Sequence, residues 1–265
     1  MRQWVCAVTV EQVRALYRDY IGSASGELAI VGDFDPDVCL PVLRATLSGW
    51  KAPQPYARIQ RPVTRAPAGA DFKINTPDKA NAVYAAGLVW ALQDEHPDYP
   101  ALVMGNFILG GGSLSSRLGD RVRQKEGLSY GVGSSFTASA LEPRASFTAT
   151  AISNPQNVEK VVRVIREEID RLLRDGVTPD ELARAKTGYL QQLAVSRAND
   201  AALVGMLTGQ LHEGRTMAYY AAQEERIQQL TPDQVTAALR RHIDPRQLVI
   251  VTAGDFEKNA AADQK

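Results

Sequence analysis

The chain has 265 residues, of which 45% are hydrophobic and 23% are charged, and this makeup excludes a fibrous or disordered protein. Thirty basic residues balance thirty acidic ones, so the chain lacks the positive field that attracts a phosphate backbone, and we expect no nucleic-acid partner. No apolar run reaches the roughly 18–20 residues of a membrane span, which predicts a soluble chain without a membrane-spanning segment.

The start of the chain predicts a helix followed by a strand. Thr9 and Gln12 have the spacing of a capping box, which places a helix start at Thr9, and this helix is expected to end near Ile21. The apolar run Leu28–Val31, closed by Gly32-Asp33-Phe34, predicts a buried strand that ends in a turn.

The middle of the chain predicts strands and short helices behind a linker. Prolines spread through residues 53–69 indicate an extended linker, because each proline disfavours helix in the residue before it. A glycine run, Gly110-Gly111-Gly112, is expected to end the first helix after this linker. In chain order we expect two strands, two helices and an antiparallel hairpin: Ala70–Asn75, Asn81–Trp90, Pro97–Leu109, Ser115–Lys125, and Leu128–Ser139 with Arg144–Ser153.

The last third is predicted to be helical. An apolar stripe predicts a helix over Pro155–Arg174, and Thr178-Pro179-Asp180-Glu181 predicts the capped start of a long helix. Strands followed by a block of helices, without strict alternation, indicate an α+β fold in which a largely antiparallel sheet has helices packed on one face.

A repeat sets the domain organisation. Residues 8–34 recur as residues 230–256 at an ungapped offset of 222, and both copies combine capping-box spacing with a Gly-Asp-Phe ending. One copy at each end predicts a complete domain of about 220 residues preceded by the last unit of a similar domain. We therefore expect residues 1–52 to be that closing helix–strand unit, residues 53–69 a proline-rich linker, and residues 70–265 the complete domain.

The residues of known catalytic and metal motifs are missing. The chain has three histidines, His96, His212 and His242, and contains neither H-E-x-x-H nor H-x-x-E-H. We expect no catalytic residue and no metal site, while a site built from these three separated histidines stays open as an alternative. The glycine run follows a helix and has no lysine after it, which argues against a phosphate-binding loop.

One stretch, LGGGSLSSRLGDRVRQKEGLSY from Leu109 to Tyr130, is unlike ordinary core. A glycine loop precedes Ser-Ser-Arg-Leu, a short helix ends in Arg-Gln-Lys-Glu-Gly-Leu, and a tyrosine follows Arg123 seven residues later. This pattern resembles the non-catalytic half of the zinc peptidases related to pitrilysin, insulin-degrading enzyme and the mitochondrial processing peptidase. The resemblance extends to the repeat unit at Val8–Asp35, to Val177–Leu182 and to the order of elements, so it covers nearly the whole chain.

The resemblance implies a clamshell of two homologous α+β halves, of which the first holds zinc on H-x-x-E-H and the second, represented by this chain, is metal-free. It makes Arg123 and Tyr130 substrate-binding residues that reach an extended peptide near the partner's zinc, and it places Gly110, Gly111 and Gly112 in a loop at the chamber rim. The zinc-bearing half is then the partner, on the same polypeptide or as a separate subunit. The bacterial cytoplasm and the periplasm are both compatible with the resemblance.

Side-chain chemistry agrees with these roles, because the N–H and O–H donors of Arg123 and Tyr130 suit a peptide carbonyl or the oxyanion formed from it. The alternatives are a cation at a helix C-terminus for the arginine and a core aromatic for the tyrosine. Arg117 and Arg121 are weaker candidates, expected at the surface or in salt bridges. We expect a metal-free peptidase half that is inactive alone; the other readings are a purely structural or assembly subunit and an anion-binding protein that uses the glycine loop.

Overall fold

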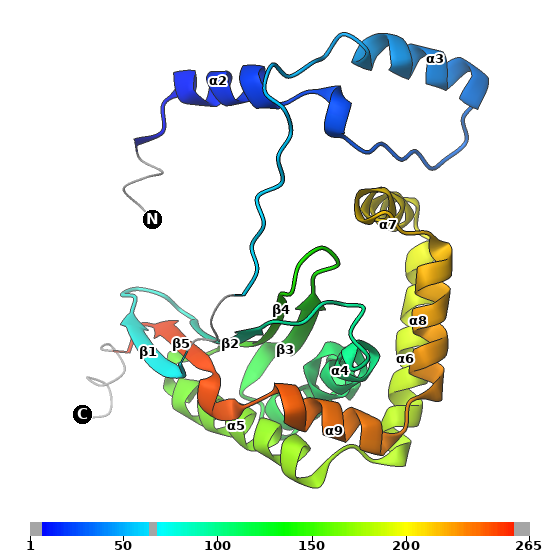
Figure 1. Cartoon of the computed structure of the whole chain (residues 1–265). Coiled ribbons are helices and arrows are strands. Elements are labelled where there is room, and N and C mark those ends of the chain that lie inside the picture. Colours follow the sequence, from blue (N-terminus) through cyan, green and yellow to red (C-terminus); the bar gives the residue numbers. More distant parts are fainter. Residues whose placement is uncertain (1–6, 64–67, 257–265) are drawn as a thin grey trace. The chain divides into compact units, whose positions relative to one another are not determined.

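The computed structural model describes residues 7–63 and 68–256 (Figure 1). The chain divides into two compact units. Unit 1 consists of the residues up to Gln60 together with Ser196–Thr216, and unit 2 consists of Arg61–Val195 together with the residues from Met217 onward.

Unit 2 is built on a five-stranded sheet with the order β1-β5-β2-β4-β3. Its strands are β1 (Ala70–Asn75), β2 (Ala82–Trp90), β3 (Ser129–Ala138), β4 (Ala145–Ser153) and β5 (Val249–Gly254). β1 and β5 pair in parallel, and the other neighbouring strands pair antiparallel. The predicted α+β class with a largely antiparallel sheet is therefore confirmed, including the hairpin of β3 and β4.

Helices cover one face of this sheet, where α5 and α9 lie side by side (Figure 1). Alternate residues of β2 and β4, such as Tyr84, Leu88 and Phe147, face these helices and are buried, as the two-residue period of a strand requires. The helices of unit 2 are α4 (Tyr99–Asn106), α5 (Val158–Asp175), α6 (Pro179–Arg197, of which the part up to Val195 belongs to this unit), α8 (Met217–Gln229) and α9 (Pro232–His242).

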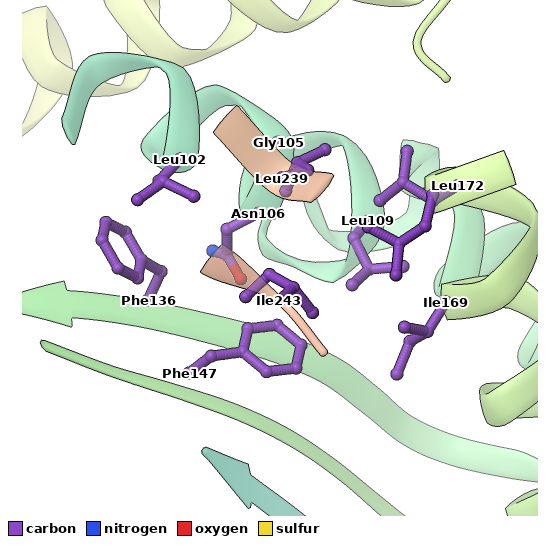
Figure 2. Close-up of a pocket in the computed structure, with 11 residues that line it drawn as sticks. Leu102, Gly105, Asn106, Leu109, Phe136, Phe147, Ile169, Leu172, Leu239 and Ile243 are labelled. Carbon is purple, nitrogen blue, oxygen red and sulfur yellow. The ribbon is translucent and has the colours of Figure 1, made fainter. Parts of the chain in front are cut away.

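The core lies where α4, α5 and α9 meet the sheet (Figure 2). Leu239 of α9 packs over Gly105 of α4, where a Cβ atom would come within 2.6 Å of the leucine side chain, so glycine lets the two helices approach closely. Phe147 and Ile169 line the same spot, and the void between these side chains is only about 10 Å³. Because a void of this size barely admits one water molecule, it is a packing gap and not a ligand site.

The second copy of the repeat forms α9 and β5, and the first copy begins with α2 (Val10–Tyr20). Thr9 and Thr231 both make the predicted capping boxes. The strand predicted at Leu28–Val31 is wrong, because these residues have no regular secondary structure. A strand needs neighbours for its backbone hydrogen bonds; β5 has β1 and β2 beside it, whereas the described residues of unit 1 include no strand at all.

Unit 1 is helical where it is described. It contains α2, the short turn η1 (Ser23–Ser25), α3 (Pro36–Leu47) and α7 (Asp200–Glu213). α3 was not expected from the sequence, although Asp35 caps it and Pro36 occupies a favoured first helical position. Neither α2 nor α3 has a buried residue, so in this part of the chain the apolar side chains of both helices lack a core to pack into.

The segment between the first copy of the repeat and the sheet has no helix or strand over residues 51–63 and 68–69. Residues 64–67 of the predicted linker and residues 257–265 of the predicted domain lie outside the described residues. Over the described ranges, no helix combines the length and the apolar character that crossing a membrane requires.

Candidate functional site

The segment from the glycine run to β3 is a series of tight helical turns. α4 ends at Asn106, before the predicted helix end at Leu109, and passes into a π-helical turn, η2 (Phe107–Gly111), that includes two glycines of the run. A 3-10 turn, η3 (Ser113–Ser115), leads to a second π-helical stretch, η4 (Gly119–Lys125). Gly127 then takes a φ of 61°, which only glycine adopts without strain. Such π turns are rare and concentrate at functional sites.

The three glycines of the run pack against their own helix and against β3. A Cβ atom on Gly110 would lie 2.4 Å from the backbone nitrogen of Ser134, and one on Gly112 would lie 2.8 Å from the carbonyl oxygen of Phe107. A Cβ atom on Gly111 would lie 2.8 Å from Asn106 Nδ2. The hydroxyl of Ser134 donates to Asn106 Oδ1 at 2.8 Å, which connects the end of α4 to β3. The run therefore serves close packing of a helical turn on the sheet edge.

A hollow of about 500 Å³ lies between this run and α6. Arg117 and Arg184 line it, but Arg184 lies 2.6 Å from Asp180, and Arg117 lies 2.7 Å from Glu181. An anion in this hollow would meet guanidinium groups whose donors already bind carboxylates. The geometry therefore gives no support to the anion-binding alternative.

Arg117, the arginine of the Ser-Ser-Arg-Leu motif, has a side chain that is only 10% exposed. Its guanidinium donates to Glu181 Oε1 at 2.7 Å, to Glu181 Oε2 at 2.9 Å and to the carbonyl oxygen of Gly176 at 2.8 Å. The backbone N–H and the hydroxyl of Thr178 donate to the same carboxylate at 2.9 and 3.0 Å. Burial alone raises the pKa of Glu181, but the hydrogen bonds from Arg117 and Thr178 outweigh burial and lower the pKa to about 2. Arg117 thus joins the signature segment to the start of α6.

Most basic side chains of η4, the helical stretch that follows Arg117, form ion pairs with nearby acidic residues. Arg121 lies 3.2 Å from Glu126, and Lys125 lies 2.7 Å from Asp120. Arg123 differs from them, because it is exposed and has no ion pair or hydrogen bond within residues 7–63 and 68–256. Its guanidinium is therefore available to a ligand.

Tyr130 is displayed by a β-bulge near the start of β3. Ser129 pairs with Ser153 and Gly131 pairs with Ile152, which leaves Tyr130 as the extra residue, and 93% of Tyr130 is exposed. The buried Ser129 holds this bulge, since its hydroxyl donates to the Ile152 carbonyl at 2.6 Å and accepts from the Gly131 N–H at 3.2 Å. Bulges of this kind redirect a side chain. The alternative of a core aromatic is wrong for Tyr130, and Ser129 is a positioning residue to which the sequence analysis assigned no role.

The sheet face opposite the helices is partly apolar and exposed. Ile74, Ala253, Val83 and Ile152 lie side by side on neighbouring strands and form one row across the sheet. About half of the surface of Ile74, of Val83 and of Ile152 is accessible to solvent. The row ends at Gly131, directly after Tyr130. An exposed apolar row that ends next to Tyr130 is a surface of the kind at which proteins bind other chains.

The three histidines occupy two places in the structure. His96 and His242 meet in unit 2 with Asp98, a residue that the sequence did not single out, and their possible ligand atoms lie within 4.8 Å of one another. His212 belongs to unit 1, where its Nδ1 lies 3.0 Å from Glu27. The H-x-x-E-H motif that would hold a catalytic zinc does not occur in this sequence.

Comparison with known proteins identifies the family. The model of the peptidase M16 inactive domain matches residues 7–189. The chain belongs to this family. This M16 inactive domain is 29% identical over 269 residues to an uncharacterised zinc protease of Streptomyces coelicolor, covering 97% of the chain and 56% of the relative. It is 34% identical over 98 residues to the uncharacterised zinc protease YmxG of Bacillus subtilis, covering 37% of the chain and 23% of the relative.

Solved structures support the same fold. The crystal structure of a peptidase M16 inactive domain from Pseudomonas fluorescens superposes with a TM-score of 0.75 at 27% identity, over 94% of this chain and 57% of that one. A protease from Helicobacter pylori superposes with a TM-score of 0.76 at 14% identity, over 96% of this chain and 61% of that one, and shows the fold alone. The M16 inactive domain thus spans little more than half the length of these relatives, and the family predicted from the signature segment is confirmed.

Proposed function

We propose that this M16 inactive domain is the metal-free half of a two-half zinc endopeptidase and that Arg123 and Tyr130 hold an extended peptide substrate. The observation that carries the proposal is the contrast within the signature segment. Arg117, Arg121 and Lys125 all have structural partners, whereas Arg123 is exposed without one and Tyr130 is turned outward by a bulge. Side chains without a hydrogen-bond or ion-pair partner in their own fold are available for a ligand.

The chemistry that these residues supply is hydrogen-bond donation. The guanidinium of Arg123 has several N–H donors, and the phenol of Tyr130 has one O–H donor, so both suit a peptide carbonyl and, more strongly, the oxyanion that forms from it. The exposed row of Ile74, Val83 and Ile152 beside Tyr130 fits the apolar side chains of the same peptide. The zinc-bearing half supplies the metal and its ligands, and this chain alone does not cleave peptides.

The repeat supports the proposed domain organisation. Val13 of α2 and Val235 of α9 are equivalent positions, yet Val13 is 43% exposed whereas Val235 is completely buried. The first copy of the repeat therefore has the apolar face of a domain core without the sheet that covers such a face in unit 2. We infer that residues 1–52 close a preceding homologous half, the zinc-bearing partner, on the same polypeptide or as a separate subunit. Residues 53–69 are then the linker, and residues 70–265 are the inactive domain.

Reconstitution tests the proposed roles of Arg123 and Tyr130. The chain is combined with its H-x-x-E-H half, and kcat/KM is measured on an unfolded fluorogenic peptide. Tyr130→Phe and Arg123→Ala should each lower kcat/KM by about tenfold to a hundredfold, the range for losing a charge-assisted hydrogen bond. Both residues are exposed, so the free energy of unfolding should change by less than about 0.5 kcal/mol.

Matched controls are Tyr56→Phe and Arg246→Ala, which alter exposed residues that are not part of the signature segment Leu109–Tyr130. Both should leave kcat/KM unchanged. An active complex that tolerates Tyr130→Phe and Arg123→Ala equally well contradicts the proposed roles. A complex that assembles but cleaves no peptide, with unmodified residues, favours the structural or assembly subunit instead.

A further inference from the structure

Two histidines and an aspartate from distant parts of the sequence lie close together in unit 2. His96 and Asp98 lie in the turn that leads into α4, and His242 is the last residue of α9. We propose that His96, Asp98 and His242 form a binding site for a divalent transition-metal ion such as zinc. This site is separate from catalysis, does not depend on the peptide-binding role, and replaces the expectation of a chain without any metal site.

The arrangement of the rings fits two imidazoles on one ion. With Zn–N bonds of about 2.1 Å and tetrahedral angles, two coordinated imidazole rings have centroids about 5 Å apart. The centroids of His96 and His242 are 5.5 Å apart, and the rings stand edge to face at 89°. His242 Nε2 already lies 2.8 Å from Asp98 Oδ2. The widest pair of ligand atoms, within 4.8 Å, must close to about 3.4 Å, which small side-chain rotations supply.

Local changes make the electron pairs of the proposed ligands available to the ion. His96 Nδ1 accepts from the backbone N–H of Asp98 at 3.1 Å, so its single in-plane lone pair is engaged in this hydrogen bond, and an ion bound at Nδ1 has to replace it. His242 Nε2, which lies 2.8 Å from Asp98 Oδ2, presents its lone pair in the tautomer that carries the proton on Nδ1. Two imidazoles and one carboxylate are a donor set that zinc, cobalt and nickel accept, with water completing the coordination.

Arg241 is the competitor for this site. Its guanidinium donates to Asp98 Oδ2, the oxygen that also faces His242. Its side chain is 61% exposed, so it can leave the carboxylate for solvent when an ion arrives. Because a cation beside the carboxylate repels a second cation, Arg241 should weaken metal binding in the unmodified protein.

The scaffold around the three residues is ordered before any ion binds. The N–H of His96 donates to the Gln93 carbonyl at 3.0 Å, and the N–H of Tyr99 donates to the His96 carbonyl at 3.0 Å. His242 stacks on Trp90, which stacks in turn on Phe136 of β3. Phe136 lies six residues beyond Tyr130 along β3, about 20 Å at 3.3 Å per residue, so the site lies well away from the proposed substrate contacts.

Titration of the full chain, without a histidine tag, with Co²⁺ and Zn²⁺ tests the proposal. Visible absorption of Co²⁺ should show one bound ion per chain, and Zn²⁺ should raise Tm because the ion connects α4 to α9. His96→Ala and His242→Ala should each weaken binding by more than about tenfold. His212→Ala, which removes the histidine of unit 1, is the matched control and should leave binding unchanged.

Arg241→Ala provides a test with the opposite sign. Removing the competing cation should tighten binding by about fivefold, a change that ions held loosely elsewhere on the surface would not show. Circular dichroism verifies that each variant is folded, and Asp98→Asn serves as a second ligand variant if one histidine variant does not fold. Absence of binding at millimolar metal, or binding that survives both His96→Ala and His242→Ala, overturns the proposal.

Discussion

Replacing Arg117 with methionine should destabilise unit 2 by about 3 kcal/mol at neutral pH. Methionine keeps an unbranched apolar stem but removes the guanidinium, which in the native structure donates twice to Glu181 and once to the Gly176 carbonyl. The Arg117 side chain is only 10% exposed, so water replaces these hydrogen bonds poorly. Glu181 then keeps Thr178 as its remaining hydrogen-bond partner.

The magnitude follows from the pKa of Glu181, which falls from 4.5 to about 2 on folding. A decrease of this size corresponds to about 3.4 kcal/mol of stability. Because the folded-state pKa is the lower one, this contribution is fully present above about pH 4.5 and disappears as the pH falls toward 2; about 2 kcal/mol of it is lost by pH 3. Thr178 supplies part of the effect, and the side chain of Glu181 is 31% exposed, so Arg117 accounts for less than the whole. The unpaired Gly176 carbonyl adds a cost of about 1 kcal/mol.

Urea unfolding followed by circular dichroism measures this loss at pH 7 and pH 3. Arg117→Met, Glu181→Gln and the double variant form a cycle in which the two single losses should exceed the double loss by about 2 kcal/mol. Arg184→Met, which breaks the exposed pair with Asp180, is the control and should cost less than about 0.5 kcal/mol. A loss below about 1 kcal/mol for Arg117→Met at pH 7, or the same loss at both pH values, would refute the reasoning.

Two further predictions compare equivalent substitutions. Gly110→Ala should lower the free energy of unfolding by about 2–3 kcal/mol, because the new Cβ would lie 2.4 Å from the Ser134 nitrogen. Gly87→Ala, whose new Cβ would meet nothing within 4 Å, should leave the free energy of unfolding unchanged or raise it slightly. Thermal unfolding compares the two variants, and equal losses would contradict the packing role of the glycine run. Val235→Ala should lower the free energy of unfolding by about 2 kcal/mol, and the equivalent Val13→Ala by less than about 0.5 kcal/mol, since only Val235 is buried. A large loss of stability from Val13→Ala would show that unit 1 has a core of its own.

Much of the fold could be predicted because its signals are local. The capping boxes at Thr9 and Thr231 satisfy donors within one turn of helix, so four residues are enough to predict them. The strand β1 was predicted at the observed residues, Ala70–Asn75. The strand at Leu28–Val31 failed for the opposite reason, since an apolar run forms a strand only where another strand receives its hydrogen bonds.

The candidate site was predicted in part. The signature segment identified Arg123 and Tyr130, but the sequence could not show that Arg123 lacks a partner while its neighbours Arg121 and Lys125 have one. The bulge that exposes Tyr130 depends on the register between β3 and β4 and on the hydroxyl of Ser129, neither of which leaves a periodic signal. Contacts between residues far apart in the chain are not encoded in local spacing.

The sequence by itself determined the family, the α+β class, the capped helices and the absence of a catalytic zinc motif, because each of these depends on neighbouring residues or on a motif that can be read directly. Only the tertiary structure decided which equivalent positions of the repeat are buried, which arginine of the signature segment is structural, and that His96 meets His242. The physical reason is that burial and pairing are properties of the surfaces that fold against a residue. Two copies of one segment therefore have the same helix cap and opposite exposure, as Val13 and Val235 show.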